Sequence, residues 1–138
     1  MHSVATRITF TPHQSALEFF FESTLERELR LKDAVEHAQA GALRSVLLKT
    51  WQQSQDHTER LQAFGLKSSH DTSYVSRLTP SANDDPVDVL LKSERRFLEL
   101  CDASLASLPE RARPAVIQQR EELSASIERL AAFRLLIN

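Results

Sequence analysis

The chain has 138 residues, the length of one domain, and its 41% hydrophobic and 26% charged residues are typical of a globular protein. Its formal net charge of −2 gives no strong field to attract nucleic acid or an anionic membrane, so we expect neither as a partner. No apolar run approaches the roughly 20 residues that span a bilayer, and the N-terminus has no signal core, which predicts a cytoplasmic location. The two glycines and five prolines favour long, uninterrupted helices.

Residues 1–10 are expected to form an arm ahead of a single helical domain at residues 11–138. Apolar or β-branched residues alternate with others along this arm, as in a strand, at Val4, Thr6, Ile8 and Phe10. A lone strand has no sheet to join, so an extended arm packed on a neighbouring helix or on a second subunit is the simpler interpretation.

The first predicted helix covers residues 12–40 and has a carboxylate on its buried face. Thr11, Pro12 and Gln14 form a capping pattern at its start. Steps of three and four then connect the residues of one face, Leu17, Phe21, Thr24, Glu28, Leu31, Val35 and Ala38. The run ERELRLK at residues 26–32 is expected to be a solvated face with local ion pairs.

The second predicted helix covers residues 42–64, between Gly41 and Gly65. Its stripe has a polar centre that contains His57. Antiparallel pairing about the turn near residue 41 would put Glu28 opposite Gln53, and His57 within about one helical turn of Glu28.

Residues 65–85 are polar, show no sustained period and are expected to be a crossover. A connection of this length is unusual in a compact domain unless it spans a distance. A helix of about 22 residues is roughly 33 Å long, and about 20 extended residues reach further than that. The crossover would therefore make the third helix parallel to the second.

The third predicted helix covers residues 86–108 and begins at the capping Asp85 and Pro86. Glu94 lies on its apolar stripe, where a carboxylate needs a cation, a hydrogen-bond donor or a metal as its partner. Cys101, the single cysteine, lies on the same stripe and is interpreted as a small core residue and not as a nucleophile.

The fourth predicted helix covers residues 110–136, after Pro109. Val116, Leu123, Ile127 and Leu130 lie on its apolar stripe. Glu121 and Glu128 are at the edge of this stripe, where each would either point inward or be solvated.

This plan predicts an all-α, four-helix bundle, and it resembles the ferritin-like bundles, which have a long crossover between helices two and three. Within that group the chain is similar to a family of small uncharacterised bacterial proteins. The similarity covers roughly residues 25–134 and is carried by two segments. They are GALRSVLLKTWQQSQDHTERLQAF and VLLKSERRFLELCDASLASLPERARPAVIQQREELSASIERL.

The resemblance implies a candidate metal site made of Glu28, His57 and Glu94, with Glu121 and Glu128 as weaker ligands. Di-iron members take a glutamate from each of two helices and a Glu-x-x-His pair from each of the other two. Here Ser54 stands three residues before His57, and the fourth helix contains no histidine. A full di-iron centre is therefore not expected, whereas a simpler iron, zinc or manganese site would suit the carboxylates and the imidazole.

Two classes of function follow. The first is a non-enzymatic helical module with a degenerate metal site, which forms a homodimer or binds a protein partner. The second is a metal-binding protein with oxidative or storage chemistry. For the three residues themselves, a buried hydrogen-bonded cluster, a metal site and a solvent-facing Glu28 are all compatible with the pattern. No phosphate-binding glycine loop or strand-borne nucleophile motif is present in the sequence.

Overall fold

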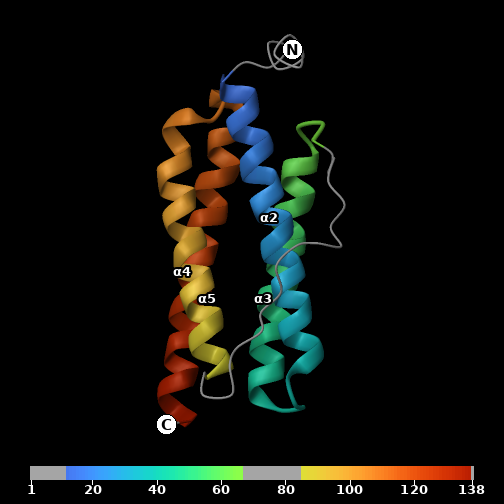
Figure 1. The fold of residues 1–138 in the computed structure, drawn as a ribbon, viewed down its shortest axis with the longest axis vertical. Helices are drawn as coiled ribbons and strands as arrows, with labels where there is room; N and C mark the ends of the chain where they lie inside the picture. Colours follow the sequence, from blue (N-terminus) through green and yellow to red (C-terminus); the bar gives the residue numbers. More distant parts are fainter. Residues whose placement is uncertain (1–11, 67–84, 138) are drawn as a thin grey trace, which may run out of the picture.

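The structure, a computed structural model, describes residues 12–66 and 85–137 and confirms the predicted all-α, four-helix bundle (Figure 1). The long helices are α2 (Pro12–His37), α3 (Ala42–Gln62), α4 (Pro86–Ser104) and α5 (Arg113–Ile137). Two short 3₁₀ turns, η2 (Leu105–Ser107) and η3 (Glu110–Ala112), join α4 to α5. Within these described ranges no helix is both long enough and apolar enough to cross a membrane.

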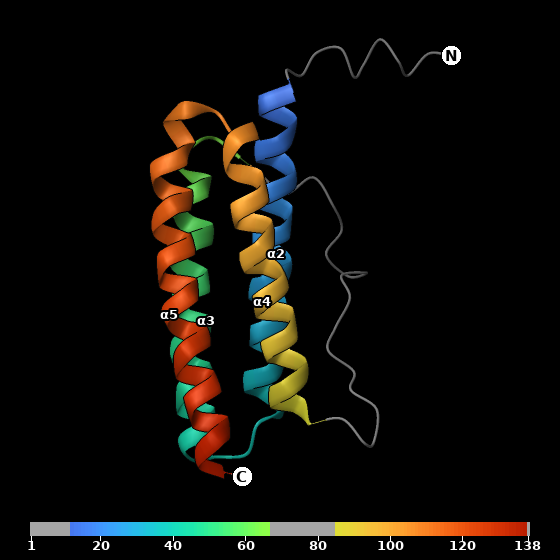
Figure 2. The same ribbon diagram turned by 90° about the vertical axis from the view of Figure 1, so that its left-hand side faces the viewer.

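The bundle consists of two helical hairpins, α2 with α3 and α4 with α5, which lie side by side in Figure 1. In Figure 2 the α4–α5 hairpin faces the viewer, in front of the α2–α3 hairpin. Helix α2 also packs against α4, and α3 against α5. The colours of Figure 1 show that α3 and α4 run in the same direction and that both run opposite to α2 and α5. The predicted crossover at residues 65–85 and the arm at residues 1–10 lie almost entirely outside the described residues.

Local sequence explains where the helices begin and end. The Asp85 side chain accepts a hydrogen bond from the backbone N–H of Val87 at 2.9 Å, and Pro86 occupies the first turn of α4. Gly41 (φ 130°) and Gly65 (φ 84°) adopt the positive φ values that other residues avoid, at the two ends of α3.

The third helix ends earlier than residue 108 because of Pro109. The residue before a proline is pushed out of the helical region, and Leu108 is accordingly extended, with φ −81° and ψ 153°. The chain tightens into η2 just before this point, and Pro114 lies at the start of α5, where its missing N–H leaves no helical bond unmade.

The core runs along the bundle axis and takes residues from all four helices. Its fully buried apolar side chains include Leu17, Phe20, Phe21, Leu31, Leu61, Cys101, Leu108, Val116 and Leu123. Burial raises the pKa of the Cys101 thiol to about 12. Cys101 therefore lies in the core as a neutral thiol, in agreement with its position on the apolar stripe.

Candidate functional site

The centre of the bundle contains a buried ion pair between Arg27 of α2 and Glu94 of α4. The two residues are 0% and 2% exposed. The Arg27 Nε–H donates to both carboxylate oxygens of Glu94, at 3.2 and 3.0 Å, and Nη2 donates to Oε1 at 2.9 Å. The planar guanidinium thus binds both oxygens of the carboxylate along one edge, which is the strongest geometry for such a pair.

Aromatic rings close one side of this pair. The guanidinium carbon of Arg27 lies 5.9 Å from the centroid of the Phe97 ring, and Phe20 stacks on Phe97 with 5.7 Å between their centroids. The rings exclude water and favour a cation over their faces. Removal of one charge would leave the other without solvent and without a partner.

His57 of α3 contacts the other side of the guanidinium and is held in one tautomer. Arg27 Nη1 lies 3.3 Å from His57 Nδ1. Because a guanidinium can only donate, Nδ1 must accept, and the single ring proton of a neutral imidazole then lies on Nε2. Nε2 is 2.7 Å from Oε1 of Glu122 on α5, to which it donates.

Burial lowers the pKa of His57 to about 4. Its hydrogen bond to Glu122 acts in the opposite direction, and the adjacent Arg27 charge adds to the lowering. His57 is therefore neutral at pH 7. Protonation would place a second N–H donor against Arg27, which the geometry does not accommodate.

Side chains of α3 and α5 extend the cluster towards the surface. Gln53 accepts from Arg27 Nη2 at 3.4 Å and from the Ser126 hydroxyl at 2.9 Å. The Glu122 carboxylate also accepts from Arg60 at 3.3 Å and from Gln118 at 3.2 Å. Partial burial opposes ionisation of Glu122, but the hydrogen bonds from His57 and Gln118 and the charge of Arg60 lower its pKa.

We call Arg27, Gln53, His57, Glu94, Glu122 and Ser126 the central cluster. It contains one residue from α2, one from α4 and two from each of α3 and α5. With His57 neutral, the charges of Arg27 and Arg60 balance those of Glu94 and Glu122. The cluster can therefore fix the mutual register of the four helices, but it contains no solvent-facing nucleophile.

Of the predicted ligands, the structure brings His57 and Glu94 to the central cluster and leaves Glu28 out. Glu94 and His57 are buried, on opposite sides of Arg27. Glu28 is only half-buried, and no hydrogen bond or ion pair joins it to either residue. Arg27, and not Glu28, contacts Gln53 and His57. Glu121 and Glu128 are both exposed.

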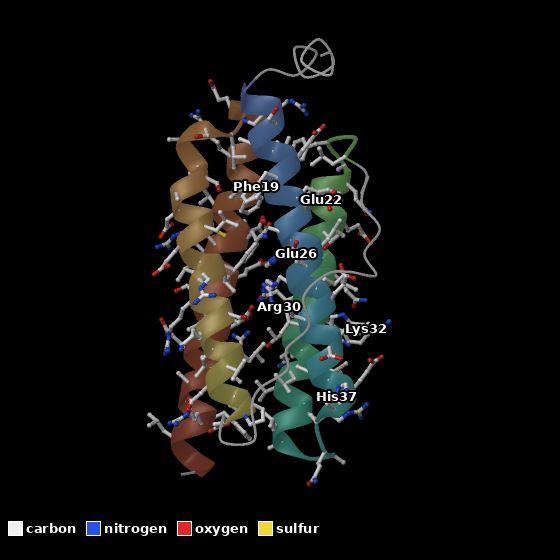
Figure 3. All side chains as sticks on the ribbon, in the orientation of Figure 1. Phe19, Glu22, Glu26, Arg30, Lys32 and His37 are labelled. Atoms are coloured by element: carbon white, nitrogen blue, oxygen red, sulfur yellow. The ribbon has the colours of Figure 1, made fainter. Side chains whose placement is uncertain are left out.

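The interpretation of residues 26–32 as a solvated face was wrong for Arg27. Arg27 is wholly buried, because it occupies the turn between Thr24 and Leu31 on the core face of α2. The expected local ion pair does occur, between Arg30 and Glu26 at 4.0 Å, but the Arg30 side chain is only 17% exposed (both residues are labelled in Figure 3).

No metal-binding group is formed by the described parts of the chain. In them, no three or more His, Cys, Asp or Glu side chains are arranged to hold a metal ion. Nδ1 of His57 and both oxygens of Glu94 face Arg27, whose permanent charge occupies the place between them.

Comparisons with known proteins give no relative from which a role could be transferred. No family model matches the chain, and neither does any curated protein or solved structure. The function therefore has to be inferred from the side chains of the bundle.

Replacement of Arg27 by methionine should destabilise the fold by about 3–5 kcal/mol, because Glu94 would stay buried without its cation. The double replacement Arg27→Met with Glu94→Leu should recover most of that loss. Urea unfolding gives both free energies, with Arg120→Met as the control, since Arg120 makes its ion pair to Asp102 at the surface. Equal stability of the wild type and the single variant would show that this pair does not hold the core.

Stability should fall in acid because of His57. Its folded-state pKa of about 4 lies below the unfolded value of 6.5, so the unfolded chain takes up the proton first and stability is lost as the pH falls from 6.5 to 4. The loss at pH 4 should be about 3 kcal/mol. Unfolding at several pH values measures it, and His57→Gln should flatten the slope between pH 5 and 6.5. An unchanged slope in this folded variant would contradict the assignment of the acid loss to His57.

Proposed function

We propose that the protein is a non-enzymatic four-helix-bundle module in which an arginine takes the central place that ferritin-like proteins give to a metal centre. The observation that carries this proposal is the position of the Arg27 guanidinium. It bonds Glu94 along one edge and points Nη1 at His57 Nδ1, 3.3 Å away. These are the two buried candidate ligands, and both direct their lone pairs at the same cation.

The chemistry of arginine supports this proposal. A guanidinium stays protonated in proteins, so it cannot yield its charge to an incoming metal ion. A metal that took the lone pairs of Glu94 and His57 would have to expel Arg27 from the core or leave it buried and unpaired, which is strongly unfavourable. A degenerate metal site, with the acid and the imidazole kept for structural reasons, agrees with these contacts.

A structural role for the central cluster also follows from its connectivity. The Arg27–Glu94 pair links the two hairpins through α2 and α4, and the His57–Glu122 bond links them through α3 and α5. Both links can be made in only one register of the four helices. A buried polar cluster of this kind opposes slippage of one hairpin along the other.

Metal analysis tests the non-metal role. Purified protein should contain less than ~0.1 iron, zinc or manganese per chain, and the added ions should not raise its melting temperature, because mass action stabilises only what binds. Binding that is lost in Glu94→Ala and in Glu28→Ala, but kept in the exposed control Glu99→Ala, would instead favour the metal-binding alternative with storage or oxidative chemistry.

As a module, the protein is proposed to act by association with a second copy or with another protein. Four large apolar side chains on the described surface support this. Phe19 is 61% exposed, Leu135 75%, Ile117 43% and Leu48 37%. Figure 3 shows Phe19 in the first half of α2, away from the turn to α3. Exposed aromatic residues are enriched at protein interfaces.

Sedimentation should detect a dimer at about 100 μM protein, where even a complex of micromolar Kd is formed. Phe19→Ser should shift the equilibrium towards the monomer, since it removes an exposed aromatic side chain from the contact. The control is Lys32→Ser on the same helix, which removes an exposed polar side chain. A wild-type protein that stays monomeric at this concentration would exclude self-association and leave a different protein as the partner.

A further inference from the structure

One end of the bundle contains a cavity of about 700 Å³. Its described walls come from the carboxyl end of α2, the first turns of α3 and α4, and the last turns of α5 (Figures 1 and 2). The volume falls in the range of roughly 300–1,000 Å³ that accepts small molecules. No residue of the central cluster is among the described lining residues, so the cavity is separate from the buried ion pair.

The walls of the cavity are apolar on most sides. The described lining includes Leu43 and Leu47 of α3, Val87 and Leu90 of α4, and Phe133 of α5. Such walls suit an alkyl or aryl body, whose transfer from water is favourable in proportion to the apolar area that it buries.

Small residues leave the cavity unfilled on the side of α2. Ala34 and Ala38 lie on this helix, and Ala40 lies in the turn that follows it. An empty apolar cavity costs stability because the atoms around it lose contacts that a filled core would have. A hydrocarbon occupant would restore those contacts.

The charged side chains of the described lining already have partners within the protein. Two of these residues can carry a charge, Asp33 and His37. A carboxylate oxygen of Asp33 lies 3.3 Å from His37 Nδ1, which is also 2.8 Å from the Asp33 carbonyl oxygen. Asp33 has a further interaction beyond these two. A charged ligand would therefore have to compete with contacts that the protein makes itself.

The charges next to the cavity are balanced as well. The last carbonyl groups of a helix have a partial negative charge, but here Arg44 Nε–H donates to the Val35 carbonyl oxygen at 3.4 Å. On α5, Arg134 pairs with Asp85 and Asp88. The described surroundings thus favour neither a cation nor an anion in the cavity.

We propose that this cavity binds a neutral, largely hydrocarbon molecule, with its apolar body between Leu47, Leu90 and Phe133. A charged head group would lose its hydration on entry, whereas a neutral hydroxyl or carbonyl group loses far less. The inference goes beyond the proposed function, and it depends neither on the central cluster nor on the loss of a metal centre.

A matched set of octyl probes tests the class of ligand. 1-Octanol, octanoate and octylammonium share one hydrocarbon chain, and at pH 7 their head groups are neutral, negative and positive. Titration of the full chain should give binding of octanol about tenfold tighter than that of either ion. Calorimetry or amide chemical shifts measure the three affinities.

A series of alcohols tests whether the hydrocarbon chain is buried. From 1-butanol through 1-hexanol to 1-octanol, each added CH₂ group should tighten binding by about fourfold, because each one leaves water for the apolar walls. Equal affinities along the series would contradict burial of the chain.

Two kinds of variant place the site. Ala38→Phe should fill the cavity and abolish octanol binding, and Ala34→Phe serves the same purpose if circular dichroism shows that Ala38→Phe is unfolded. Phe19→Ser is the control, because it removes an exposed apolar side chain from the other half of α2 and should bind octanol like the wild type.

Three further results would overturn the proposal. One is that no alcohol binds. Another is that octanoate or octylammonium binds as tightly as octanol, which would reject a neutral molecule as the ligand class. The last is binding that persists in a folded cavity-filled variant, which would place the ligand elsewhere. A metal in the central cluster would contradict the proposed function and leave this test unaffected.

Discussion

The arrangement of the helices depends on one interaction, the buried ion pair of Arg27 and Glu94. Two full charges in a dry interior are favourable only when every donor and acceptor is met. Here the Arg27 guanidinium reaches Glu94, Gln53 and His57, and the Phe97 ring lies against it. Any shift of α2 along α4 by one turn would break these bonds together. The apolar stripes alone would tolerate several registers of the helices. The ion pair is compatible with only one of them.

The other polar residues of the central cluster complete the hydrogen bonds of this ion pair without adding net charge to the core. Arg27 already donates to Nδ1 of His57, so the imidazole must be neutral and must place its proton on Nε2. That proton then requires an acceptor, which Glu122 supplies at 2.7 Å. Glu122 in turn is balanced by Arg60 at the half-exposed edge. Charges thus alternate from the core outwards. The outermost pair, Arg60 and Glu122, is partly solvated, so its desolvation costs little free energy.

Much of the bundle could be predicted from the sequence because helix stripes and caps are local signals. The burial of Glu94 follows from its position between Leu90 and Phe97, and its need for a partner follows from burial alone. The identity of that partner could not be predicted from the sequence. Positions 27 and 28 are both three or four residues from Thr24 and from Leu31, so the stripe fits either. Only the rotation of α2 against its neighbours, which puts both Phe20 and Phe21 inside, selects Arg27.

Two other features could not be read from a periodic pattern. Glu122 lies at the edge of its helix face, with 32% of its side chain exposed, so its sequence position looks like that of any solvated carboxylate. The cavity of about 700 Å³ lies at the end of the bundle where α2 is followed by α3. It depends on the volume left where the helix ends meet, which is a property of packing and not of any one helix.

The packing around helix α2 therefore differs between its middle and its carboxyl end. Its middle is crowded, with phenylalanine rings and a fully engaged guanidinium, and it has no space for another group. Its carboxyl end and the turn that follows it contain Ala34, Ala38 and Ala40, whose small side chains cannot fill the space opposite Leu90 and Phe133. In the proposed structural role, the charge-balanced centre would hold the four helices in register and so oppose collapse of the underfilled end. A bundle held together only by apolar contacts would close such a space by sliding, since nothing in its stripes would oppose that movement.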